Sequence, residues 1–143
     1  MSEGQQTGIV EDLLQKSASV DYSIRLPESE FEVMSAVWEG EPPMTTAFLM
    51  QQIGGKKGWK APTLISFLTR LEERGYIASF KKGKERYYIP LANKERYIHA
   101  VTEQFVEQYH NGSFVKFMDS LFLDRSFDDK EIDELLGWLK SRY

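Results

Sequence analysis

The chain has 143 residues, of which 41% are hydrophobic and 13% aromatic, a composition that suits one large globular domain or two small ones sharing a core. It contains no cysteine, which excludes disulfides, thiol catalysis and thiolate metal sites. No apolar run is long enough to span a membrane, and Met1 to Thr7 lacks the apolar core of a signal peptide, so we expect a cytoplasmic protein with no membrane insertion.

The net charge of −4 is distributed unevenly along the chain. Residues 26–52 contain five acidic side chains and no basic one, whereas residues 53–92 contain nine basic and three acidic ones. A phosphate backbone responds to the local field more than to the total charge, so the basic segment indicates a nucleic-acid-binding surface. The alternative is an ordinary solvated surface.

Residues 1–25 are interpreted as an N-terminal extension that is flexible or forms a short helix. The segment is polar at first, and four apolar residues then have the spacing of a short amphipathic helix. These residues are Ile9, Val10, Leu13 and Leu14. The pattern assigns no role to the segment.

Two short helices are predicted next. The first begins near Pro27, where acidic residues complement the helix dipole, and ends at Gly40. Its buried side would carry Phe31, Met34, Val37 and Trp38. The second covers residues 46–52 and is capped by Thr45.

The central prediction is a helix from Trp59 to Gly75, preceded by a basic loop. Its apolar residues recur at i, i+3, i+4 and i+7 and must face a core. They are Leu64, Phe67, Leu68 and Leu71. The opposite side carries short hydroxyls and charges, which stay in water or contact a ligand: Thr63, Ser66, Thr69, Arg70 and Glu73.

Two β-rich runs follow this helix and predict a hairpin. They cover residues 76–81 and 85–90 and are joined by Lys82-Gly83-Lys84. A helix with a hydroxyl-bearing face and a following hairpin with a basic tip are the arrangement of a winged helix-turn-helix, here over residues 26–91. The predicted DNA contacts are Lys60, Thr63, Ser66 and Arg70 on the helix, Lys82, Lys84 and Arg86 on the wing, and Thr46, Lys56 and Lys57 before the helix.

Residues 92–143 have the pattern of three helices, capped by Asn93, by Ser113 and by the capping box of Asp128 and Glu131. They carry more apolar surface than so short a segment can bury alone, and helix-turn-helix proteins usually act as dimers. We therefore predict a mainly α protein with a small β-hairpin and a C-terminal helical dimerisation region. The predicted dimer contacts are Phe105, Phe114, Phe117, Met118, Leu121, Phe122, Leu135 and Leu139.

No pattern of catalysis is found. The two histidines, His99 and His110, lie on one predicted helix, and His99 with Glu103 is more typical of a surface pair than of a metal site. Neither a phosphate-binding glycine loop nor a Gly-x-Ser-x-Gly motif occurs. The sequence thus predicts no enzyme activity, no metal and no cofactor.

Several separated motifs resemble the penicillinase-repressor family (BlaI/MecI type). They are the segments 26–38 and 59–75, the Arg-Tyr-Tyr of residues 86–88, and Asp-Asp-Lys-Glu-Ile-Asp-Glu-Leu at 128–135. The resemblance covers residues 26–142. It implies a winged helix that binds a palindromic double-stranded operator, C-terminal helices that form a homodimer, and release through a sensor-linked protease.

Three positions depart from that family. Ile65 stands where members of the antibiotic-resistance type have a basic residue, which shifts the expected base contacts to Lys60, Thr63, Ser66 and Arg70. Ser120-Leu121 stands where those members have the cleaved Asn-Phe pair, so the mode of release stays open. Copper-responsive relatives carry a C-terminal cysteine cluster, and the lack of cysteine excludes that sensing mode.

Two classes of function remain. The leading hypothesis is a dimeric transcriptional repressor. The alternative is a winged-helix module for protein–protein contact without specific DNA binding, against which the basic hairpin tip argues. The operator sequence, the target genes and the inducing signal are not encoded in these patterns.

Overall fold

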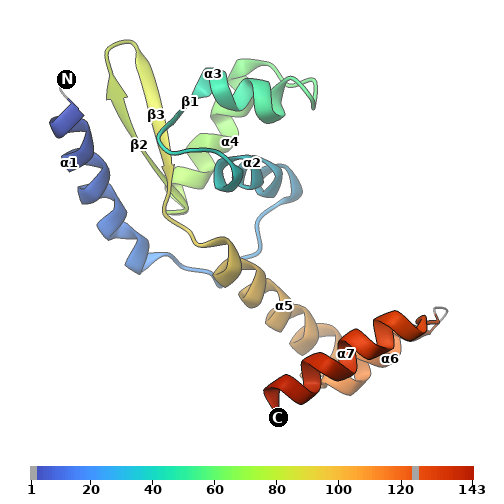
Figure 1. The fold of residues 1–143 in the computed structure, drawn as a ribbon. Helices are drawn as coiled ribbons and strands as arrows, with labels where there is room; N and C mark the ends of the chain where they lie inside the picture. The colour runs from blue at the N-terminus through green and yellow to red at the C-terminus, as the bar shows by residue number, and fades with distance from the viewer. Residues whose placement is uncertain (1–2, 124–125) are drawn as a thin grey trace. The chain divides into compact units, whose positions relative to one another are not determined.

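The computed structural model describes residues 3–123 and 126–143 and divides into two compact units, Met1–Val101 and Thr102–Tyr143 (Figure 1). The first unit contains most of the elements. They are α1 (Glu3–Leu14), the 3-10 helix η1 (Gln15–Ser19), α2 (Glu28–Glu39), β1 (Met44–Thr45), α3 (Thr46–Leu49), the π-helical turn η2 (Met50–Gly54), α4 (Ala61–Glu73), β2 (Ile77–Lys82), β3 (Glu85–Pro90) and the start of α5 (Lys94–His110).

Helices α2 and α4 supply the centre of the first core. The predicted stripe of α4 is confirmed, since Leu64, Leu68 and Leu71 are buried and Phe67 packs against them half-buried. Val33, Met34 and Val37 of α2 are buried opposite them. The helix itself is shorter than the predicted 59–75, because Lys60 is its N-cap and Pro62 stands in its first turn. Gly75, with φ of +78°, follows its end as predicted.

The predicted helix over 46–52 is α-helical only as far as Leu49. Thr45 caps it as expected, with the Phe48 N–H donating to Thr45 Oγ1 at 3.1 Å. From Met50 the turn widens, and the Gly55 N–H donates to the Met50 carbonyl at 2.7 Å. The Met50 side chain packs closely over Gly54, where a Cβ would lie 2.5 Å from the Met50 sulfur.

The hairpin is part of a three-stranded antiparallel sheet in the order β1-β3-β2. Strands β2 and β3 pair from Ile77 with Pro90 to Lys82 with Glu85, as the sequence pattern predicted. Strand β1, which the sequence analysis missed, pairs Met44 with Tyr88. A strand of two residues has no periodicity that a sequence pattern can detect.

The two faces of the hairpin are both covered. Ile77 and Tyr88 point to the core formed with α2 and α4. On the other face, Ala78, Ile89 and Leu91 pack against Val10 and Leu13 of α1 and against Val20. In Figure 1, α1 runs alongside the hairpin. Two of the four apolar residues predicted on the N-terminal helix, Val10 and Leu13, therefore contact the sheet.

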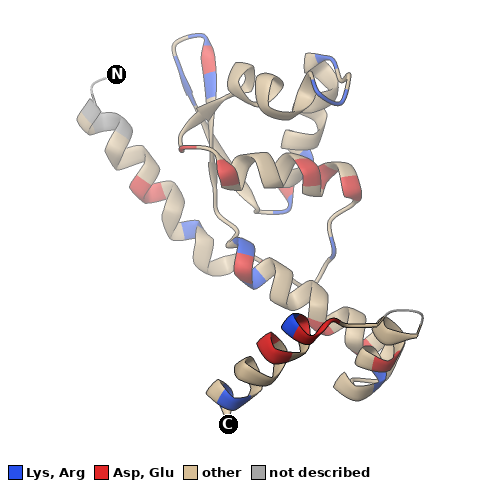
Figure 2. Ribbon diagram, turned by 45° about the vertical axis from the view of Figure 1, so that its right-hand side comes forward, with Lys and Arg blue, Asp and Glu red and all other residues tan. Residues whose placement is uncertain are grey.

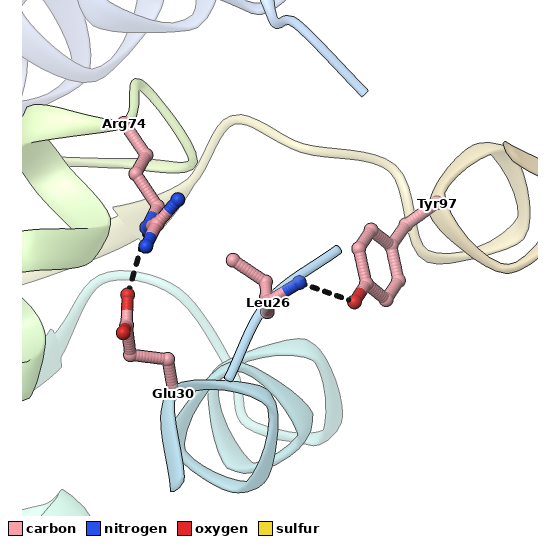
Figure 3. A network of polar contacts seen from close by, with 4 residues as sticks. All are labelled: Leu26, Glu30, Arg74 and Tyr97. Carbon is pink, nitrogen blue, oxygen red and sulfur yellow. Dashed lines mark hydrogen bonds and ion pairs between the residues drawn. The ribbon is translucent and has the colours of Figure 1, made fainter. Parts of the chain in front are cut away.

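The start of α5 is held by hydrogen bonds to segments far away in the sequence. The Leu26 N–H donates to the buried Tyr97 hydroxyl at 2.9 Å (Figure 3). The Asn93 N–H donates to the Tyr22 hydroxyl at 2.8 Å, and the Trp38 indole N–H donates to the Ala92 carbonyl at 2.8 Å. The chain up to Tyr97 is therefore fixed to the first core.

The second unit consists of the rest of α5, α6 (Phe114–Phe122) and α7 (Asp129–Arg142). Its predicted caps are confirmed: the Lys116 N–H donates to Ser113 Oγ, and Asp128 and Glu131 form a capping box. Within residues 102–123 and 126–143, no residue is buried. These three helices therefore lack a closed core of their own.

Candidate nucleic-acid interface

The polar side of α4 is exposed along its length. Thr63, Ser66 and Arg70 are all exposed, while Leu64 and Leu68 on the other side are fully buried. Thr69 is also exposed, but its hydroxyl donates to the Ile65 carbonyl at 2.9 Å. The open hydroxyls on this face are therefore those of Thr63 and Ser66, and Ile65 adds a side chain that is 43% exposed.

Aromatic packing fixes the start of α4. The Trp59 and Phe67 rings lie 4.9 Å apart between centroids, and both pack against the core half-buried. The Arg70 guanidinium carbon lies 5.8 Å from the Phe67 ring centroid. Trp59 thus closes the core beneath the preceding turn, as the sequence analysis favoured, and leaves exposed Lys60 at the N-cap.

The basic loop before α4 is a hydrogen-bonded turn, in which the Lys57 N–H donates to the Ile53 carbonyl at 3.0 Å. Lys56 is exposed. Lys57 is exposed too, but its Nζ lies 2.7 Å from Glu32 Oε1 of α2. This hydrogen bond and the charge of Glu32 raise the pKa of Lys57 above its usual value. The two neighbouring lysines therefore differ in how much of their charge is offset within the protein.

The hairpin carries a basic tip. Gly83 takes the positive φ (+65°) that a two-residue loop between Lys82 and Glu85 requires. Lys84 is exposed and Lys82 is half-buried. The predicted contact residue Arg86 lies further down β3, where its Nη1 donates to Ser79 Oγ at 2.9 Å and Ser79 donates to Glu72 Oε1 at 2.7 Å.

Figure 2 shows that the hairpin tip and the turn before α4 both lie at the upper end of the first unit, where blue segments gather. Thr46 starts α3 half-buried, beside its capping neighbour Thr45. The ten predicted DNA-contacting residues thus all belong to the first unit, with Lys84 and Lys56 at its exposed basic segments.

One basic residue of the segment has a structural role instead. Arg74 Nε lies 2.8 Å from Oε1 of the buried Glu30 (Figure 3). From the sequence, Arg74 belonged to the positive segment, and no structural role was predicted for Glu30, Glu72 or Ser79. The burial of Glu30 could have been predicted, because Glu30 lies four residues before Met34 and therefore on the same buried side of α2.

The predicted dimer residues all belong to the second unit, and none of them is buried. Phe105, Phe114, Leu121 and Leu135 are exposed, and Phe117, Met118, Phe122 and Leu139 are half-buried. Phe105 and Phe117 approach each other with ring centroids 6.2 Å apart. These side chains therefore leave much apolar surface of the second unit open to solvent.

An exposed polar helix face beside a basic hairpin, in this order of elements, defines a winged-helix DNA-binding protein. The chain belongs to the penicillinase repressor family, whose model matches residues 26–141. The family is one of transcriptional repressors and not of enzymes, and this chain is a regulator of that class. Residues 1–25, including α1, precede the matched range.

Two curated relatives illustrate the similarity. The penicillinase repressor of Bacillus licheniformis is 22% identical over 111 residues, covering 78% of this chain and 86% of the relative. The methicillin resistance regulatory protein MecI of Staphylococcus aureus is 22% identical over 117 residues, covering 82% and 94%. The solution structure of the DNA binding domain of the repressor BlaI matches with a TM-score of 0.46 and 23% identity, over 51% of this chain and 88% of that one.

Residues 3–123 and 126–143 contain no group of three or more His, Asp or Glu side chains that could hold a metal ion. Over the same residues, no helix has both the length and the apolar character needed to cross a bilayer.

Proposed function

We propose that this protein represses transcription by binding a palindromic operator as a homodimer, with α4 in the major groove and the β2–β3 wing along the backbone. The observation that carries the proposal is the exposed row of Thr63, Ser66 and Arg70 on a helix whose other side is buried. Hydroxyls and guanidinium groups at this spacing can reach base edges and phosphates. A bacterial repressor of this kind works in the cytoplasm, where its DNA lies, and we propose that location for this protein.

The wing and the turn would supply sequence-independent affinity. Lys84 and Lys56 are exposed, and Lys82 stands beside Gly83. Cations near phosphates release counterions from DNA, so each contact adds about one unit to the salt dependence of binding. In this proposal Lys60 at the N-cap of α4 and Thr46 at the start of α3 complete the contacts.

A selection experiment tests the operator. The wild-type protein is incubated with a pool of random duplexes, and the bound DNA is sequenced. We expect a palindrome whose half-site centres lie about 34 Å apart or a multiple of that distance, as two-fold docking requires. A pool that stays random after repeated rounds would overturn sequence-specific binding and favour the protein–protein module.

The proposal of a dimer is supported by the many exposed apolar side chains of the second unit, since large exposed apolar surfaces mark association sites. Tyr97 is buried in the first core, so a truncation that tests the dimer should end after Val101 and not at Pro90. We expect that variant to be monomeric and to bind the selected duplex much more weakly, because a second bound copy raises the effective concentration of the first. A monomeric full-length protein at micromolar concentration would contradict the dimer.

Release through a sensor-linked protease, which the resemblance implies for the family, would here act near Ser120-Leu121. That bond lies inside α6, with Ser120 exposed and Leu121 48% exposed. A protease needs an extended chain, so local unfolding of α6 would have to precede cleavage. Within a single chain, none of residues 102–123 and 126–143 is buried, so the proposed dimer contacts would be the main interactions that oppose this unfolding.

A further inference from the structure

Three side chains form a hydrogen-bonded chain between the last turn of α4 and the hairpin. Ser79 Oγ donates to Glu72 Oε1 at 2.7 Å and accepts from Arg86 Nη1 at 2.9 Å. We propose that Glu72 and Ser79 are positioning residues, which fix Arg86 and the wing relative to α4. This inference rests on the proposed function, in which both elements contact one DNA duplex.

The register of the hairpin explains how the three groups meet. Ser79 pairs with Tyr88 and Lys81 pairs with Arg86, so Ser79 and Arg86 are diagonal neighbours on one face of the sheet. Tyr88 on the same face is buried in the core that α4 helps to form. The side chain of Glu72 therefore needs only to cross from the edge of α4 to the adjacent strand.

The location of Glu72 calls for an explanation other than DNA affinity. An acidic side chain on the basic segment opposes the field that attracts phosphate. Its neighbour Glu73 is also exposed, but the Glu73 side chain makes no hydrogen bond or ion pair with the described residues. The two glutamates thus carry the same charge at nearly the same place, and only Glu72 is bonded to the hairpin.

Arg86 can take part in this chain and still contact DNA. A guanidinium group has five N–H donors, and the bond to Ser79 uses one of them. The remaining donors can reach a phosphate from an orientation that is already fixed. Binding then requires less ordering of a long side chain and of the hairpin that carries it, which favours affinity.

The test is a double-mutant cycle on DNA affinity. The probe is a duplex that the wild-type protein has selected from a random pool. The dissociation constant of its complex with each protein is measured at several salt concentrations for Glu72→Ala, Arg86→Ala and the double variant. Glu73→Ala is the matched control. Because the side chains of Glu72, Glu73 and Arg86 are exposed, each variant should fold. The thermal midpoint of each variant is measured as well.

We expect Glu72→Ala to bind about fivefold more weakly although it removes a negative charge, and the double variant to bind no more weakly than Arg86→Ala, since coupled positions are not additive. Glu73→Ala should bind as tightly as the wild type or more tightly. Glu72→Gln, which keeps an acceptor for the Ser79 hydroxyl, should restore most of the affinity. If Glu72 only stabilised the fold, Glu72→Ala would lower the thermal midpoint, and its effect on DNA affinity would not depend on Arg86.

Three results would overturn the inference. If Glu72→Ala binds as tightly as Glu73→Ala, Glu72 acts only through its charge. If the effects of Glu72→Ala and Arg86→Ala multiply in the double variant, the two residues act independently. A wild-type protein that selects no duplex removes the proposed function together with this inference, whereas selection by the wild type with a failed cycle removes the inference alone.

Discussion

Glu30 of α2 and Arg74 at the end of α4 form an ion pair across the first core, with Arg74 Nε 2.8 Å from Glu30 Oε1. Glu30 is 3% exposed, whereas the Arg74 side chain is 31% exposed (Figure 3). The pair fixes the last turn of α4 one residue before Gly75 and the hairpin. It therefore holds the end of α4 against α2.

Replacing Glu30 by alanine should lower the free energy of unfolding by about 2 kcal/mol, because it removes a charged hydrogen bond and leaves Arg74 partly buried without its partner. Glu28→Ala is the control, since it removes the same charge from an exposed position of the same helix. Urea unfolding of both variants measures the difference. Equal destabilisation by the two substitutions would mean that the ion pair adds nothing.

The Tyr76 hydroxyl is buried without a hydrogen-bond partner among the described residues. Burial, with smaller contributions from Tyr97, Tyr22 and Asp21, raises the pKa of Tyr76 to about 12. The folded-state pKa of Tyr76 exceeds the unfolded value of about 10. The contribution of neutral Tyr76 to the free energy of unfolding is therefore complete below pH 10 and is lost as the pH rises toward 12.

Tyr76→Phe should therefore flatten the loss of stability between pH 10 and 12, the window that the raised pKa defines. At neutral pH it should leave the free energy of unfolding unchanged or raise it by about 1 kcal/mol, because it removes an unsatisfied buried group. Urea unfolding across the alkaline range is the measurement. A Tyr76→Phe protein with the same alkaline decline as the wild type would show that other groups cause it.

Local patterns made much of the fold predictable. The apolar stripe of α4 could be predicted because one side is buried along the whole helix. The helix caps could be predicted because a cap depends on a residue only three positions away, as at Asn93, Ser113 and Asp128. The polar side of α4 follows from the same periodicity. Its use as a DNA contact stays a prediction.

Interactions between distant segments could not be predicted in this way. The ion pair of Lys57 with Glu32 joins the turn before α4 to α2, and the hydrogen bonds from Glu72 to Arg86 need the register of the hairpin. The predicted boundary between residues 91 and 92 rested on the end of the hairpin. Tyr97 lies beyond it and yet packs with Phe31 and Tyr76, contacts that no local pattern encodes.

Helix α1 should stabilise the wing from its outer face. Leu13 packs against the cluster of Ala78, Ile89 and Leu91, whereas its neighbour Leu14 is 43% exposed. Leu13→Ser should lower the free energy of unfolding by about 1 kcal/mol, because half-buried apolar surface is lost, while Leu14→Ser should change it by less than about 0.5 kcal/mol. Thermal or urea unfolding of the two variants compares them directly. If Leu13→Ser is neutral, α1 does not brace the sheet.

The two lysines of the turn before α4 should differ in DNA binding. Lys56→Ala should lower the slope of log affinity against log salt by about one unit, as the loss of one phosphate contact does. Lys57→Ala should lower it less, since Glu32 already offsets the Lys57 charge at 2.7 Å. Glu32→Ala should in turn steepen the slope by freeing Lys57. Identical slopes for Lys56→Ala and Lys57→Ala would show that the ion pair opens on DNA.

In the proposed function, the exposed side of α4 reads base sequence. The ratio of the affinities for the selected duplex and for a scrambled duplex of equal length measures this reading. At physiological salt we expect a ratio of at least about 10³ for the wild type. For Thr63→Leu and Ser66→Leu we expect a ratio close to unity with an unchanged thermal midpoint, because both side chains are exposed and the buried side is untouched. Variants that fold and keep the wild-type ratio would contradict the account.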